Sequence, residues 1–122
     1  LELRDPRGEG LPWGAFEVED ASVSTSGGDQ KPGHILDPRT GRPARGVLAA
    51  TVVAASGLEA DALSTAVFVL GARDGLALVA RRGASGLVLV EEDGRRLLLT
   101  TPGFAARFGL QAAAGVLVRE EP

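Results

Sequence analysis

Residues 47–71, VLAATVVAASGLEADALSTAVFVLG, decide the fold because a buried strand passes directly into a long helix there. β-branched and apolar residues fill 47–55, a composition that predicts a buried strand. Ser56 and Glu59 have the spacing of a capping box, in which the serine hydroxyl accepts a hydrogen bond from the backbone N–H of the glutamate. We therefore expect a helix over 57–70, ended by the glycine that follows it.

Shorter strands are expected on either side of this unit. Asp93-Gly94, between two runs of apolar residues, is the usual signal for a two-residue type I′ hairpin turn. The order of strands and helices along the chain predicts an α+β fold with a mainly antiparallel sheet packed with helices. The expected strands cover residues 1–4, 15–19, 21–25, 87–91, 96–100 and 116–119.

Two short helices complete the expected elements. Asp74 is suited to cap the first, which we expect over 75–82. Thr101 and Pro102 suit the N-cap and the first position of the second, which we expect over 102–108.

Composition excludes several classes of function. The 122 residues are enough for one small domain, and a hydrophobic fraction of 44% indicates a folded core. A net charge of -3 gives no support for a nucleic-acid or membrane surface, and no apolar run approaches the ~18 residues of a membrane span. The absence of Cys and the single His exclude thiolate and multi-histidine metal sites. The chain lacks Met, so we expect that its start was removed, and its compartment is not readable.

Asp61 and Thr65 are the first candidates for a functional site. They are four residues apart on the expected helix, so they lie on one face, one turn apart. Most of their neighbours are apolar, which predicts a helix buried on most sides. In one interpretation Asp61 caps the helix or pairs with an arginine, and Thr65 bonds back to a carbonyl. In the other, both side chains supply oxygen ligands to a hard divalent cation such as Mg²⁺.

A second candidate is the segment 34–43, HILDPRTGRP, in the long non-periodic stretch 26–46. Loops of about twenty residues within compact domains are usually functional or disordered. Asp37 before a proline favours an extended or turn conformation, so much of the segment is explained as a stiff turn. Arg39 could instead hold a phosphate, or pair with Asp37 or Asp61. A lone histidine such as His34 is more often structural than catalytic, but this one stands in a polar loop rather than on an apolar helix face.

Residues 24–28, STSGG, follow an expected strand. Consecutive backbone N–H groups in a glycine turn can form a concavity that binds an anion, and the hydroxyls add donors. The same composition is also typical of a turn that binds nothing.

Taken together in this order, these segments resemble the ApbE family of flavin transferases. The resemblance implies an FAD:protein FMN transferase, in which Mg²⁺ assists transfer of FMN from FAD to a Thr or Ser hydroxyl of an acceptor flavoprotein, with release of AMP. Hydrolysis of FAD, or a non-catalytic flavin- or nucleotide-binding module, is the alternative. The segments that carry the resemblance are TSG (25–27), HILDPRTGRP (34–43), TVVA (51–54), LEADALSTAVFVLG (58–71) and TPGF (101–104).

The resemblance also implies roles for individual residues. Asp61 and Thr65 match the metal ligands, and His34 and Asp61 are the implied catalytic residues. Ser26 and Gly27 are implied to line the phosphate side of the FAD site. The loop residues implied to surround the nucleotide are His34, Ile35, Asp37, Arg39 and Thr40.

Residues 1–122 resemble the C-terminal portion of a single ApbE-like domain, less than half of a usual member. The resemblance implies that the other portion supplies much of the flavin pocket and another metal ligand. A second chain or a second copy could complete the site. The family often has a second histidine before the loop motif, where this chain has Gly33.

Overall fold

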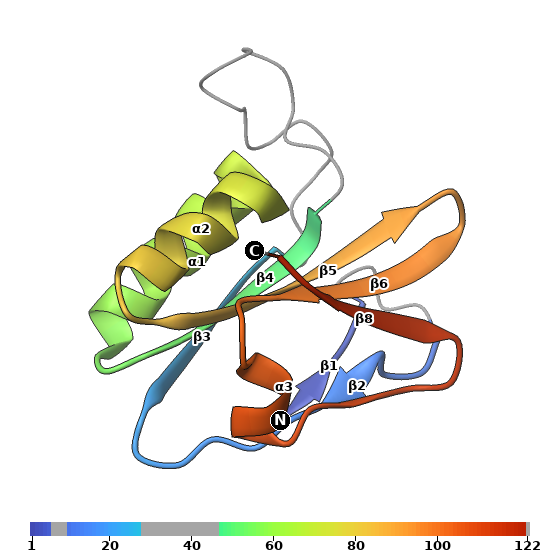
Figure 1. Ribbon diagram of the computed structural model, residues 1–122, viewed down its shortest axis with the longest axis horizontal. Coiled ribbons are helices and arrows are strands. Elements are labelled where there is room, and N and C mark those ends of the chain that lie inside the picture. The colour runs from blue at the N-terminus through green and yellow to red at the C-terminus, as the bar shows by residue number, and fades with distance from the viewer. Residues whose placement is uncertain (6–9, 28–46, 122) are drawn as a thin grey trace.

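The computed structural model describes residues 1–5, 10–27 and 47–121. Two helices cover one face of a five-stranded sheet, and a smaller sheet with a third helix covers the other face (Figure 1). In the part of the chain so described, no helix has the length and apolarity needed to cross a membrane.

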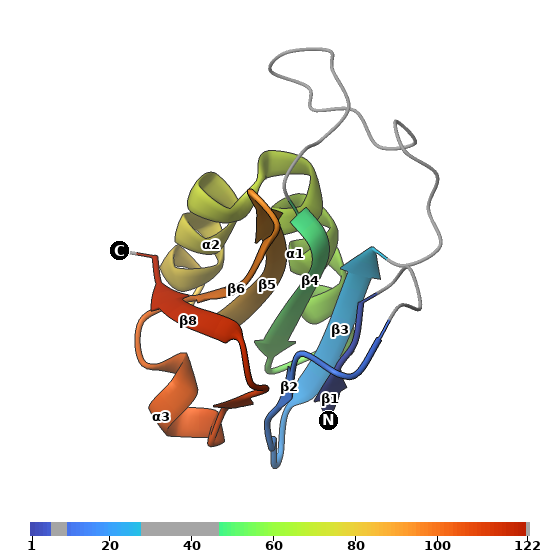
Figure 2. The same cartoon turned by 90° about the vertical axis from the view of Figure 1, so that its right-hand side faces the viewer.

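The five-stranded sheet confirms the expected α+β fold. Its strands follow one another in the order β3-β4-β5-β6-β8 (Figure 2). The first four pair in antiparallel fashion, and β8 lies parallel to β6. The strands are β3 (Ser22–Gly27), β4 (Val47–Ala54), β5 (Ser85–Glu92), β6 (Arg95–Thr100) and β8 (Val116–Glu120).

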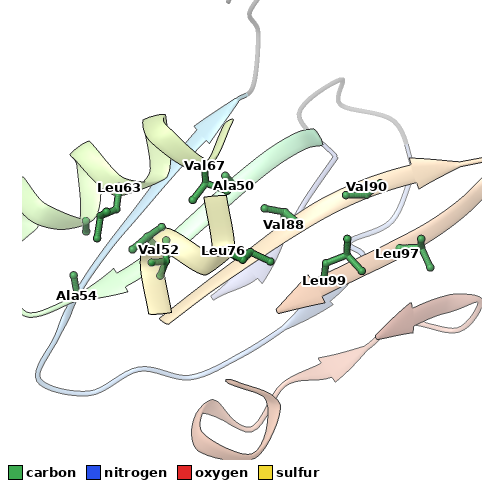
Figure 3. Close-up of a cluster of buried hydrophobic side chains, with 12 residues drawn as sticks. Ala50, Val52, Ala54, Leu63, Val67, Leu76, Val88, Val90, Leu97 and Leu99 are labelled. Atoms are coloured by element: carbon green, nitrogen blue, oxygen red, sulfur yellow. The ribbon is translucent and has the colours of Figure 1, made fainter. Parts of the chain in front are cut away.

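Strand β4 is buried on both faces, as its unbroken apolar sequence predicts. Successive side chains of a strand point to opposite faces of the sheet. Ala50 and Val52 therefore join the core under the helices, whereas Ala49 and Val53 join a second core on the opposite face. Figure 3 shows the first core, in which side chains of β4, β5 and β6 meet those of the two helices.

Helix α1 (Gly57–Leu70) has the predicted bounds, and the Oγ of Ser56 accepts a hydrogen bond from the backbone N of Glu59 at 3.2 Å. Helix α2 (Ala72–Arg81) begins earlier than expected, so the prediction of a cap at Asp74 is wrong. Gly71 has a φ of 90°, which lets the chain reverse and begin the next helix at once.

Two further helix and strand predictions are also wrong. The expected strand over 15–19 is reduced to a pair of residues in a small sheet, because its partners are equally short and Phe16 packs into the second core instead. The expected helix from Pro102 begins only at Phe104, because the Thr101 hydroxyl accepts a hydrogen bond from the Gly86 backbone N at 3.0 Å. These elements are β1 (Glu2–Leu3), β2 (Gly14–Ala15) and β7 (Gln111–Ala112) in the order β1-β2-β7, and α3 (Phe104–Phe108).

The hairpin between β5 and β6 is confirmed. Asp93 and Gly94 have φ values of 51° and 75°, and a type I′ turn requires positive φ at both central residues. This turn sets the register in which Leu89 faces Leu98, so the apolar side chains of both strands reach the same core.

The close approach of α1 and α2 depends on Gly75. A Cβ atom there would lie 2.7 Å from the Cα of Val67, which cannot move without moving helix α1. We expect Gly75→Ala to lower the free energy of unfolding by about 1–3 kcal/mol, as overpacking of a core does. The matched control is Gly57→Ala, where the nearest atom is 4.0 Å from the new Cβ. Urea unfolding checks both variants, and equal stabilities would contradict the packing argument.

Candidate functional site

Five side chains, Ser24, Ser26, Asp61, Ser64 and Thr65, meet between β3 and α1, and we call them the hydroxyl cluster. The two serines of β3 are two residues apart, so both face the helix. The three residues of α1 have the i, i+3 and i+4 spacing that places them on one helix face. Both elements therefore present their polar side chains at one interface.

Hydrogen bonds connect the whole cluster. The Ser24 hydroxyl donates to Oδ1 of Asp61 at 3.3 Å. Ser26 Oγ lies 2.8 Å from Ser64 Oγ and 3.3 Å from Thr65 Oγ1. Ser64 also donates to the main-chain carbonyl of Asp61 at 3.1 Å. The two serines of β3 thus restrain the side-chain orientations of Asp61, Ser64 and Thr65 on α1.

Exposure divides the cluster into an outer and an inner part. Asp61 and Thr65 are exposed, and Ser24 and Ser26 are partly buried. Ser64 is 0% exposed. The two residues predicted to bind a cation therefore face solvent, and a buried hydroxyl lies behind them.

This exposure corrects the prediction that α1 is buried on most sides. Asp61 and Thr65 share the solvent side of the helix with Leu58, which is 83% exposed. Asp61 also lies beyond the first turn, where the acidic residue is Glu59. The core takes side chains from the opposite side of the helix, which explains why a mostly apolar sequence leaves a carboxylate in water.

The structural interpretation is wrong for Thr65, whereas the pairing of Asp61 with an arginine stays a prediction, because Arg39 lies outside the described residues. Among the described residues, Asp61 is bonded by a serine rather than paired with an arginine. Thr65 bonds across to β3, and it is Ser64 that bonds back to a helix carbonyl. Because Asp61 is exposed, the described residues form no fully buried ion pair at this position, and the cost of desolvating one does not arise among them.

The turn predicted for 24–28 is also wrong for the residues described, because Ser24 to Gly27 lie within β3 and pair with β4. Gly27 has a φ of 127°, and a Cβ atom there would lie 2.6 Å from the carbonyl oxygen of Leu48. The lack of a side chain at Gly27 therefore permits close pairing at the end of the strand. His34, Ile35, Asp37, Arg39 and Thr40 lie outside the described residues.

The chemistry of the hydroxyl cluster fits a hard cation. A carboxylate and neighbouring hydroxyls are oxygen donors, which Mg²⁺ and Ca²⁺ prefer to nitrogen or sulfur. Over the described ranges, no three His, Cys, Asp or Glu residues gather as a metal-binding group. Asp61 and Thr65 would thus supply part of a ligand set, and water or phosphate oxygens would supply more.

The sequence interpretation missed the roles of Ser24 and Ser64. Ser64 stands on the buried side of α1 between Ala60 and Val67, where a polar residue needs a partner. A serine at that core position of the helix could therefore have indicated a polar partner from the sequence alone. Ser24 and Ser26 are two residues apart, so they point to the same face of a strand. A predicted strand that continued to Gly27 would therefore have placed Ser24 beside Ser26 at the helix.

Comparison with known proteins gives relatives for most of the chain. Residues 1–88 match the ApbE family. The chain is 38% identical over 82 residues to the FAD:protein FMN transferase of Rhodobacter capsulatus, covering 67% of the chain and 15% of that protein. It is 30% identical over 116 residues to the FAD:protein FMN transferase of Escherichia coli K12, covering 75% and 33%. The chain thus spans a third or less of the length of these relatives.

Solved structures agree with the sequence comparison. The crystal structure of Pseudomonas stutzeri flavinyl transferase ApbE, in its apo form, superimposes with a TM-score of 0.64 and 32% sequence identity. The match covers 88% of this chain and 41% of the other. The α+β arrangement described above is therefore shared with a flavinyl transferase.

The exposure of Asp61 has a consequence for stability. We expect Asp61→Asn to change the free energy of unfolding by less than about 0.5 kcal/mol, because surface changes away from the core have small effects. Breaking a buried ion pair would instead cost about 3–5 kcal/mol. Urea unfolding of the variant distinguishes the two, and a large loss would show that the carboxylate has a structural partner.

Proposed function

The chain belongs to the ApbE family, and from this membership we propose that it forms part of an FAD:protein FMN transferase. Relatives from different bacteria carry that name, which supports the proposal. Because the chain spans a third or less of their length, the activity is proposed for the complete natural polypeptide that carries it.

In the proposed reaction, a Thr or Ser hydroxyl of an acceptor flavoprotein attacks the FAD phosphorus nearer the flavin. A new O–P bond forms, and the bond from that phosphorus to the oxygen bridging to AMP breaks. The products are FMN joined to the acceptor through a phosphoester, free AMP, and the proton released by the hydroxyl. This chemistry needs a site that neutralises a pyrophosphate and holds it in line with the attacking oxygen.

In the structure itself, the observation that supports this proposal is the pairing of exposed Asp61 and Thr65 within the hydroxyl cluster. Asp61 supplies a carboxylate whose rotation is restrained by Ser24 at 3.3 Å, and Thr65 supplies a hydroxyl restrained by Ser26 at 3.3 Å. Bound Mg²⁺ would neutralise the pyrophosphate charge and orient it for attack. The two side chains belong to one rigid helix, so their separation is fixed before substrate arrives.

The remaining candidate residues have proposed roles toward the nucleotide. Ser26 and Gly27 would line the phosphate side, which the contact of Ser26 with Thr65 supports. His34 would steer a phosphate or accept the hydroxyl proton, and Arg39 would bind a phosphate through its planar fork. Ile35, Asp37 and Thr40 would shape the loop around the nucleotide. The rest of the flavin pocket would come from the remainder of the polypeptide or from a second copy of the chain.

The test measures the mass of an acceptor peptide containing a Thr after incubation with the complete polypeptide, FAD and Mg²⁺. We expect a gain equal to FMN joined through a phosphoester. Asp61→Asn should slow that transfer about 100-fold or more, the equivalent of about 3 kcal/mol of transition-state stabilisation. Glu92→Gln removes an exposed carboxylate at the far end of β5 and is the matched control, with transfer expected to be unchanged.

Two outcomes would count against transfer. If FMN and AMP accumulate while no tested acceptor gains mass, the protein hydrolyses FAD. If FAD binds and neither product nor adduct forms, the protein is a flavin-binding module without catalysis.

A further inference from the structure

Within the described part of the chain, the buried hydroxyl of Ser64 has its hydrogen-bonding neighbours in the hydroxyl cluster. Its side chain is 0% exposed and stands among apolar core residues of α1. A buried hydroxyl without a partner is costly, so its orientation is set by the groups around it. These are Ser26 Oγ at 2.8 Å, the Asp61 carbonyl at 3.1 Å and Ser24 Oγ at 3.4 Å.

Ser64 is the donor in two of these contacts, and a count of protons then gives the direction of the third. A hydroxyl has one proton to donate and two lone pairs to accept with, whereas a carbonyl oxygen can only accept. Ser64 is the donor to the carbonyl of Asp61 at 3.1 Å and to Oγ of Ser24 at 3.4 Å, so its one proton is used in these two contacts. The short 2.8 Å contact between Ser26 and Ser64 then requires Ser26 to be the donor.

The same count continues outward to Thr65. Ser26 has given its proton to Ser64, so it can only accept at the 3.3 Å contact with Thr65. The Thr65 proton therefore points inward to β3, and both lone pairs of its oxygen stay free to accept. In parallel, the Ser24 proton is directed to Oδ1 of Asp61, which as a carboxylate oxygen can only accept.

A hydroxyl ligand must present a lone pair to a cation, since its proton carries positive charge. Without the inward chain of donors, Thr65 could turn its proton toward solvent and would have to reorient before binding. The chain Thr65 to Ser26 to Ser64 to the Asp61 carbonyl removes that choice. The chain ends on the main chain of Asp61, the residue whose side chain is the other proposed ligand.

We propose that Ser64 is a positioning residue that fixes the proton direction of the hydroxyl cluster, so that Thr65 presents a lone pair to a divalent cation. This inference rests on the proposed function, because it takes Asp61 and Thr65 as the cation ligands. Ser64 itself does not touch the cation. Changes to groups that orient metal ligands typically weaken metal affinity about 10- to 100-fold.

The decisive comparison is Ser64→Thr against Ser64→Val. Both introduce a branched side chain of the same shape at the buried position, but only threonine keeps the hydroxyl. The measurement is a titration of the complete natural polypeptide with Mn²⁺, followed by the loss of the free-ion signal in electron paramagnetic resonance. We expect Ser64→Val to bind Mn²⁺ about tenfold more weakly than Ser64→Thr. Equal affinities would overturn the proposal.

Two further variants keep the test decisive if the buried position does not tolerate a larger side chain. Ser26→Ala cuts the same chain of hydroxyls at a partly buried position, and it should weaken Mn²⁺ binding to a similar degree. Thr25→Val removes a bond of the same kind, the 2.9 Å contact between the hydroxyls of Thr25 and Thr51, outside the cluster. We expect Thr25→Val to bind Mn²⁺ as the wild type does, and equal effects of the two variants would overturn the proposal.

Metal binding and FMN transfer are read separately, so the two proposals can fail separately. If the wild type binds Mn²⁺ with the expected ranking of variants but transfers no FMN, the proposed function is wrong and the role of Ser64 stands. If the wild type transfers FMN and Ser64→Val matches Ser64→Thr in Mn²⁺ affinity, the role of Ser64 is wrong alone. A wild type that binds no Mn²⁺ overturns the role of Ser64.

Discussion

The burial of β4 on both faces is the constraint on which the rest of the structure depends. A strand with one solvated face alternates apolar and polar residues, but β4 has an apolar or small residue at almost every position. Each fully buried valine gains about 1.5–3 kcal/mol relative to exposure, so both faces must be covered. The helices cover the face that carries Ala50 and Val52, and the aromatic core with Trp13 covers the face that carries Val53.

The position of the hydroxyl cluster follows from that packing. Helix α1 begins three residues after β4 ends, so it lies back over the sheet and also reaches the neighbouring edge strand β3. Over β4 the contact is apolar, through residues such as Leu63 and Val67. Over β3 it changes to hydroxyls, because Ser24 and Ser26 meet Ser64 there. The apolar contact between α1 and β4 thus keeps the hydroxyl contact between α1 and β3 in register.

Elements with a strong local pattern could be predicted from the sequence. The β4–α1 unit and the β5–β6 hairpin have their own caps, turn residues and apolar runs, and all of these agree with the final packing. The failures at Asp74 and Thr101 have one cause, since both residues look like helix caps by type. Gly71 already begins α2, and the hydroxyl of Thr101 is engaged by Gly86 across the sheet. The bond between Thr101 and Gly86 joins residues far apart in the sequence, so it leaves no local pattern to read.

Local spacing could predict part of the geometry around Asp61 and Thr65, whereas their exposure and their partners could not be predicted from it. The four-residue spacing was sufficient to place Asp61 beside Thr65 on the helix. It could not show which side of a largely apolar helix faces solvent, because the covering strand β3 is distant in sequence. Ser24 is separated from Asp61 by 37 residues, and their contact exists only through the docking of α1 on the sheet.

The choice of partner for Asp61 is itself an argument about function. An arginine beside this carboxylate would neutralise its charge and repel an approaching cation. Among the described residues, Asp61 is restrained instead by a neutral hydroxyl at 3.3 Å, which orients the carboxylate and leaves its full negative charge. The side chain also remains in water, so the charge is kept without the large desolvation cost of a buried ion. Within the described part of the chain, the carboxylate is thus oriented by a hydroxyl and not neutralised by a cationic side chain, which is the arrangement that its proposed role as a cation ligand requires.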